Sequence, residues 1–132
     1  MAEQHEAVAQ FQSPVRVGEQ IYMVIGDNKT KAQLACLDFI DGQIRWREPI
    51  GGSRGNLIAA GGHLLVLSDR GELRLAEASP EGYRELGRMQ ALGGRCWAPP
   101  ALAGGRLYCR NNGGSLVCID LRGGPRARPR IW

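Results

Sequence analysis

Several features that would mark an enzyme or a membrane protein are missing from this chain of 132 residues. It has no uncharged apolar stretch long enough to cross a bilayer, so we expect no membrane span. Residues 1–13 have neither the basic start nor the apolar run of a signal peptide. The histidines are His5 and His63, and neither has a nucleophile or an acid at the spacing of a hydrolytic triad.

The cysteines also lack a functional spacing. No Cys-x-x-Cys pair occurs among the four of them, which argues against a zinc site and against thioredoxin-type redox chemistry. Two of them lie in similar contexts, Leu-Ala-Cys-Leu-Asp around Cys36 and Leu-Val-Cys-Ile-Asp around Cys118. We therefore expect the cysteines to be small buried residues rather than ligands or disulfide partners. They are Cys36, Cys96, Cys109 and Cys118.

The formal net charge of +4 arises from 17 basic and 13 acidic residues, and the excess lies at the C-terminal end. It is accounted for by Arg122, Arg126, Arg128 and Arg130. The rest of the chain is neutral and offers no basic footprint for phosphate groups, so we expect no nucleic-acid partner. Residues 122–132 are interpreted as a basic flexible tail that proline and glycine interrupt.

What the sequence does contain is a repeat of short apolar strands and glycine turns. Nineteen glycines, seven prolines and only 6% aromatic residues favour many strands and tight turns over a helical bundle. An apolar strand, a glycine turn and a second apolar strand occur three times, with Gly18, Gly61 and Gly104 at steps of 43 residues. Repeats of about 40 to 45 residues are typical of the four-stranded blades of β-propellers. Closed propellers have about four to eight blades, so these three units are interpreted as part of a ring.

The sequence thus predicts an all-β fold, a partial β-propeller with two complete four-stranded blades and a three-stranded third blade. A polar N-terminal segment at 1–12 precedes the repeats, and strand runs that are apolar on both faces indicate sheets stacked between neighbours. The last unit is followed by Gly-Gly-Pro-Arg-Ala-Arg-Pro-Arg, which is a poor fourth strand. We expect the missing strand to come from upstream, in a ring that begins before Met1. The repeats span 13–121, with blades at roughly 13–50, 55–94 and 97–121.

Two segments of the chain resemble a known family. One runs from Leu34 through a strand, an Asp and a turn Gly to Trp46, in the position of a docking tryptophan, and the other covers 104–120. Both are similar to the PQQ-like β-propeller repeat family, which includes BamB-like assembly lipoproteins and quinoprotein alcohol dehydrogenases. The likeness covers nearly all of 13–121. The second unit departs from the pattern, because Leu-Arg-Leu-Ala-Glu replaces the Asp and its expected fourth strand contains Tyr83 but no Trp.

The resemblance implies two alternative functions. The first is a non-catalytic PQQ-like propeller region, without a cofactor, that serves as a scaffold or protein-interaction module within a larger propeller. The alternative is the C-terminal part of a PQQ-dependent alcohol dehydrogenase-like quinoprotein, with PQQ, calcium and the active site upstream. Such quinoproteins use a pair of adjacent cysteines, and no Cys-Cys pair occurs here. Asp38, Asp41 and Asp120 are interpreted as turn residues that bind backbone amides, so we expect no catalytic, cofactor-binding or metal-binding residue.

Candidate interaction residues lie in two loops, Arg54 and Asn56 in one and Trp97 in the other. The expected partners are the remaining blades of the parent propeller, a second copy of the chain, or another protein. Two uncapped end sheets would expose larger apolar patches than monomers tolerate, and this predicts self-association. The sequence leaves the compartment open, whereas the resemblance implies a periplasmic or secreted parent protein.

Overall fold

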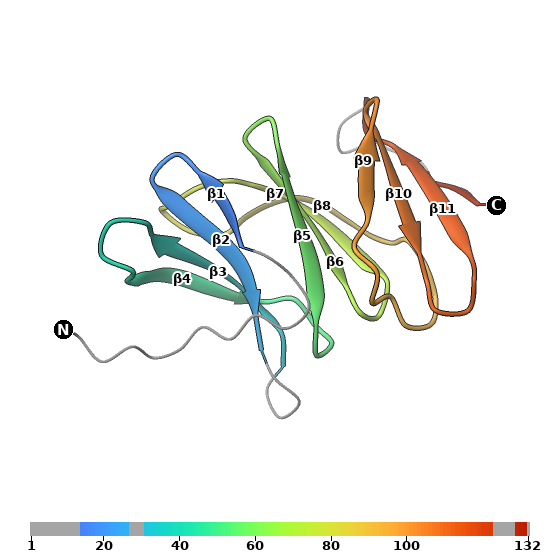
Figure 1. Cartoon of the computed structure of the whole chain (residues 1–132), viewed down its shortest axis with the longest axis horizontal. Coiled ribbons are helices and arrows are strands. Elements are labelled where there is room, and N and C mark those ends of the chain that lie inside the picture. The colour runs from blue at the N-terminus through green and yellow to red at the C-terminus, as the bar shows by residue number, and fades with distance from the viewer. Residues whose placement is uncertain (1–13, 27–30, 123–128, 132) are drawn as a thin grey trace.

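The structure is a computed structural model, and it describes residues 14–26, 31–122 and 129–131. Within these ranges the chain forms three four-stranded antiparallel sheets that lie side by side (Figure 1). None of the described residues forms a helix that could cross a membrane. The strands of the first sheet are β1 (Val15–Val17), β2 (Gln20–Ile25), β3 (Gln33–Asp38) and β4 (Ile44–Pro49). The second sheet has β5 (Gly55–Ala60), β6 (His63–Ser68), β7 (Glu72–Glu77) and β8 (Arg84–Gln90). The third has β9 (Ala101–Ala103), β10 (Arg106–Arg110), β11 (Leu116–Asp120) and β12 (Pro129–Ile131).

Each sheet begins with the same hairpin. The pairs that flank its two-residue turn are Val17 with Gln20, Ala60 with His63, and Ala103 with Arg106. In the turn between β5 and β6 both glycines have positive φ, 57° and 77°, which side chains other than glycine rarely adopt. The step of 43 residues in the sequence is therefore the spacing of equivalent hairpins in successive blades.

The hydrophobic core lies between the sheets, and the middle blade contributes to it on both faces. Leu64 and Val66 of β6 pack against the first blade, in a cluster with Tyr22 and Leu34. Leu65 and Leu67 alternate to the other face and pack in a second cluster with residues of the third blade. The third blade contributes Leu107, Cys109, Val117 and Ile119 to this cluster. The prediction that strands of this chain are apolar on both faces because each sheet is stacked is confirmed for the middle blade.

The prediction of an all-β partial propeller is confirmed, with a correction at the third blade. We expected three strands there, but β12 pairs with β11 through Val117 with Ile131 and Ile119 with Pro129. Proline has no N–H to donate to a neighbouring strand. It is tolerated in β12 because this strand is the outer edge of its sheet and has a neighbour on one side only. The position for which we expected a donor strand from upstream is filled, so the argument for that donor no longer holds.

A second correction concerns the apolar end faces. Side chains of the first blade that alternate away from the second blade form a cluster of their own, in which Met23, Ile25 and Ala35 are buried and Leu37 packs against them. This end of the arc is thus not the bare patch that we expected. The polar segment 1–12 lies outside the described residues, as does most of the tail 122–132, whose strand β12 belongs to the third sheet.

Candidate interaction surface

The connections between strands form two groups, one at each end of the sheets. A series of backbone hydrogen bonds links the connections of one group from blade to blade: Ala32 N to Gly52 O (3.1 Å), Asp69 N to Arg54 O (2.9 Å), Cys96 N to Asp69 O (2.8 Å) and Asn112 N to Arg95 O (2.7 Å). We call this side of the arc the Trp97 face. Its described connections are 26, 31–32, 50–54, 69–71, 91–100 and 111–115.

Trp97 lies on this face, in the connection from β8 to β9. The neighbouring Cys96 is buried and its amide is bound by Asp69 of the preceding turn, so the backbone at this point is fixed against the second blade. The indole itself is 43% exposed. An exposed tryptophan on a fixed backbone is an anchor of the kind found at the centre of protein interfaces.

Asn56 supports the connection that contains Trp97 through a hydrogen bond. It lies at the start of β5, is buried, and donates from Nδ2 to the backbone oxygen of Trp97 over 3.3 Å. The side chain of Asn56 is thus turned inward and supports the surface, rather than lying on it. A buried amide that is hydrogen-bonded in this way is an ordinary structural partner.

Two arginines flank the indole of Trp97. The guanidinium carbon of Arg54 lies 5.2 Å from the ring centroid and that of Arg95 lies 5.8 Å from it. Both distances are within the range of cation–π attraction, which reaches about 6 Å from the ring centroid. Arg54 and Trp97 are 43 residues apart, so they occupy the same position in successive repeats and meet across the middle blade.

The structure therefore brings together all three residues that the sequence analysis selected. It adds Arg95, which was not selected although it lies two residues before Trp97 in the same loop. Asp69 completes the local arrangement, because its Oδ1 accepts a hydrogen bond from Ser53 N over 3.1 Å. Gly52 is needed beside it, since an added Cβ would collide with that carboxylate oxygen.

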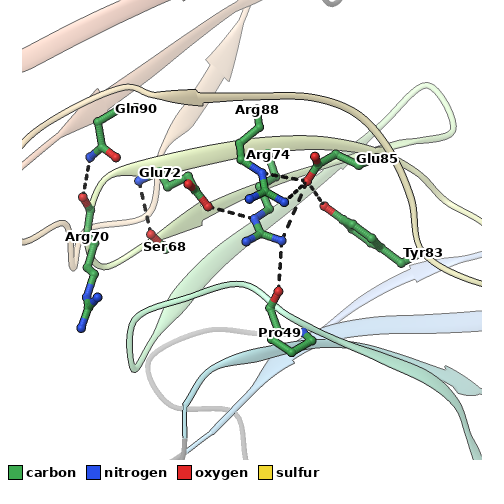
Figure 2. A network of polar contacts seen from close by, with 9 residues as sticks. All are labelled: Pro49, Ser68, Arg70, Glu72, Arg74, Tyr83, Glu85, Arg88 and Gln90. Carbon is green, nitrogen blue, oxygen red and sulfur yellow. Dashed lines mark hydrogen bonds and ion pairs between the residues drawn. The ribbon is translucent and has the colours of Figure 1, made fainter.

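A second polar site, absent from the sequence-based selection, surrounds Arg74 between the first two blades (Figure 2). Arg74 is buried, and its Nε lies 3.0 Å from Glu72 Oε1. Its Nη1 donates to the backbone oxygen of Pro49 in the first blade over 3.0 Å and lies 3.8 Å from Glu85 Oε1. Tyr83 donates to the same Glu85 oxygen over 2.7 Å. The signal in the sequence is an arginine between two leucines, in a strand that has a glutamate at each end.

The electrostatics of this network follow from burial and pairing. Burial raises the pKa of Tyr83 to about 12, and its hydrogen bond to Glu85 acts in the same direction. Burial also acts to raise the pKa of Glu85, but the hydrogen bonds from Arg88 and Tyr83 and the charges of Arg88 and Arg74 outweigh it, so this pKa is lowered. Both pKa shifts thus favour a neutral Tyr83 beside an ionised Glu85 at this contact between blades.

Trp46, at the position of the docking tryptophan, belongs to the same contact between the first two blades. Its Nε1 donates to the backbone oxygen of Ser79 in the second blade over 2.8 Å. Its ring also contacts Tyr22 at 6.2 Å and Tyr83 at 6.0 Å between centroids. Tyr83, the aromatic residue of the fourth strand expected in the second unit, therefore packs on the tryptophan of the preceding blade.

The remaining candidates have structural roles. All four cysteines are free and buried, and burial raises the pKa of Cys109 to about 12. The turn roles of the carboxylates are confirmed: Asp38 accepts from Ile40 N over 2.8 Å, Asp41 from Gln43 N over 2.8 Å and Asp120 from Arg122 N over 3.0 Å. Within the described ranges, no group of three or more His, Cys, Asp or Glu residues is placed to hold a metal ion. His63 is exposed at a hairpin, and His5 lies outside the described residues.

The stacked four-stranded sheets define a segment of a β-propeller. A family model described as outer membrane protein assembly factor BamB, of the PQQ-like kind, matches residues 1–82, and the chain belongs to that family. No curated protein matches the chain.

Two solved structures show the same fold. One is BamB from Moraxella catarrhalis, with a TM-score of 0.67 and 15% identity over 89% of this chain and 38% of that one. The other is a europium-containing methanol dehydrogenase, with a TM-score of 0.65 and 17% identity over 89% of this chain and 24% of that one. At these identities the likeness shows the fold alone. The chain spans well under half of the length of either protein.

Proposed function

We propose that this chain is a non-catalytic PQQ-like propeller segment that acts as a scaffold and protein-interaction module within a larger propeller. One observation carries the proposal, the exposed Trp97 on a backbone that Asn56 and Asp69 fix, with the guanidinium groups of Arg54 and Arg95 beside it. Tryptophan and arginine are the residue types most enriched at the energetic centres of interfaces. The polar residues of the Arg74 network, by contrast, are engaged in joining two blades.

The test is site-specific crosslinking in the full-length protein, in the cells that produce it. A photoreactive amino acid at position 97 is compared with one at position 39. Phe39 is the matched control, because it is 47% exposed, has the Arg16 guanidinium 3.8 Å from its ring centroid, and lies on the opposite side of the arc.

We expect position 97 to capture a protein that position 39 does not. That protein, once purified, should bind the wild type, lose about tenfold in affinity for Trp97→Ala, and bind Phe39→Ala normally. The proposal fails if both positions capture the same proteins, if neither captures any, or if the purified partner binds Trp97→Ala as it binds the wild type.

A second candidate function is supported by the similarity of the fold to methanol dehydrogenase. In this alternative the chain is a supporting segment of a PQQ-dependent quinoprotein whose quinone, calcium and active site lie in another part of a longer protein. The full-length protein would then reduce an electron-accepting dye with an alcohol once PQQ and calcium are added. Absence of dye reduction under these conditions would remove this alternative.

A further inference from the structure

The two sides of the arc differ in charge. On the Trp97 face, the described connections carry four basic residues, Lys31, Arg54, Arg70 and Arg95, and the single acid Asp69. We call the other side the opposite face. Its described connections, 18–19, 39–43, 61–62, 78–83, 104–105 and 121–122, carry the acids Glu19, Asp41 and Glu81 and one basic residue, Arg122, which pairs with Asp120 of β11. Figure 1 shows turns of the two groups at opposite ends of the strands, β5–β6 above and β6–β7 below.

Arg70 and Arg95 supply exposed positive charge on the Trp97 face. Several arginines elsewhere in the described structure pair with acids, as Arg74, Arg84, Arg88 and Arg122 do. None of the ion pairs between described residues includes Arg70 or Arg95, and both side chains are exposed. The acid of this face, Asp69, already accepts a backbone hydrogen bond from Ser53. An external anion would therefore meet net positive charge, because the basic residues in the described connections of this face outnumber the carboxylate of Asp69.

We propose that the Trp97 face binds an acidic peptide segment of a partner protein, with an aromatic or aliphatic side chain of the segment against Trp97 and carboxylates at Arg95 and Arg70. This inference rests on the proposed function and adds the chemistry of the partner. Arg54 holds the indole from one side, which leaves the exposed part of the ring as the contact. Exposed arginines beside an aromatic anchor supply the directional, bidentate pairing that carboxylates accept.

The charge distribution favours a peptide over a nucleic acid. A phosphate backbone needs an extended positive surface, but here the basic connections lie on one side, and the described connections of the other side carry three acids and one arginine. A short segment with a few carboxylates can bind to the Trp97 face without approaching the opposite face. Nucleic acid is therefore the alternative that the test must be able to reveal.

The test uses the full chain and a fluorescently labelled peptide of Asp, Glu, Gly and one Leu. The comparison ligands are the same peptide with Asn and Gln in place of the acids, and a labelled single-stranded DNA. We expect the acidic peptide to bind and the amide peptide not to bind, with an affinity that falls as salt is added. Trp97→Ala and Arg95→Glu should each weaken binding by about tenfold or more.

Two controls separate loss of the surface from loss of the fold. Phe39→Ala and Arg16→Glu remove the matched aromatic and arginine on the opposite face and should leave peptide binding unchanged. Arg95→Gln changes one exposed side chain, and its unfolding midpoint should equal that of the wild type while peptide binding weakens. The bond from Asn56 goes to the backbone of Trp97, so Trp97→Ala retains that support.

Each remaining outcome contradicts the inference. It is wrong if the amide peptide binds as well as the acidic one, if Trp97→Ala and Phe39→Ala behave alike, or if only the DNA binds. If the acidic peptide fails to bind but a crosslinked partner still depends on Trp97, the partner chemistry is wrong and the proposed function stands. If the partner does not depend on Trp97, the proposed function itself fails.

Discussion

Single residues in this protein are used mainly to join one blade to the next. Arg74 is the clearest case, because its guanidinium is buried yet reaches a carboxylate in its own strand and a backbone oxygen of the preceding blade. A buried charge without such partners would be strongly destabilising, so the position of Pro49 and that of Glu72 are linked through this side chain. Asn56 has the same role on the next joint, where it connects β5 to the loop of Trp97.

Two glycines in equivalent turns provide a test at this scale. Gly71 and Gly114 both have positive φ, 81° and 95°, so alanine at either position is strained. They differ in their surroundings, because a Cβ at Gly71 would collide with the backbone oxygen of Leu92, whereas a Cβ at Gly114 meets nothing nearby. We expect Gly114→Ala to lower the free energy of unfolding by about 1 to 2 kcal/mol. Gly71→Ala should cost clearly more, since the backbone must also move.

The measurement is urea unfolding of both variants, followed by tryptophan fluorescence. Gly113→Ala is the matched control, since this glycine lies in the same turn as Gly114 and has neither a positive φ nor a close contact. It should unfold close to the wild type. Equal losses for Gly71→Ala and Gly114→Ala would show that the contact with Leu92 contributes nothing.

At the scale of elements, the strands that the sequence reveals are those with strong local signals. β2, β6 and β10 follow glycine turns and are apolar, so their bounds could be predicted from the residues alone. β12 could not, because Pro129 and its arginine neighbour oppose a strand locally, and only the free edge of β11 makes pairing favourable. Local propensity is a weak guide where an existing sheet supplies the partner.

The candidate site, too, could be predicted only in part from the sequence. Arg54, Asn56 and Trp97 could be chosen from loop positions, but their contacts join residues up to 43 apart and depend on how the blades stack. The inward orientation of Asn56 is likewise a product of stacking. The Arg74 network was missed because its carboxylates come from two strands whose register no single segment determines.

The Arg74 network, which includes Glu85 of β8, makes the free energy of unfolding depend on pH. The pKa of Glu85 is lowered in the fold, so its ionised form is stabilised there relative to the unfolded chain. Its contribution to stability is therefore present above the ordinary carboxyl pKa of about 4.3 and is lost as the pH falls through the lower folded value. We expect the difference in unfolding free energy between the wild type and Glu85→Gln to be constant near neutral pH and to shrink as the pH falls below about 5.

Urea unfolding of both proteins across this pH range checks the expectation. Tyr83→Phe removes one hydrogen bond to Glu85 and leaves the arginine charges in place, so part of the same pH dependence should remain in that background. A difference between wild type and Glu85→Gln that is unchanged from neutral to acidic pH would contradict the pairing.

At the scale of the whole molecule, the chain is an open arc in which the blades are not equivalent. The middle sheet is covered on both faces, while no core cluster of described residues joins the first blade to the third. The charges of the two faces come from residues of the connections. The stacking of the sheets depends on residues of the strands. A partner on the Trp97 face and a neighbour against an end sheet could therefore bind at the same time.

The end sheet of the third blade leads to the last prediction. Val117 and Ile119 of β11 face the middle blade, so Leu116 alternates to the other side, where it is 39% exposed. We expect the chain to self-associate through this sheet, with an average mass that rises above 14.4 kDa with concentration in size-exclusion chromatography with light scattering. Leu116→Lys should shift the equilibrium toward the monomer, because it places a charge in the contact. Leu86→Lys is the matched control, since Leu86 is 37% exposed on the outer strand β8, and it should associate like the wild type. A compact monomer at every concentration, or equal effects of the two lysines, would show that this sheet does not need a neighbour.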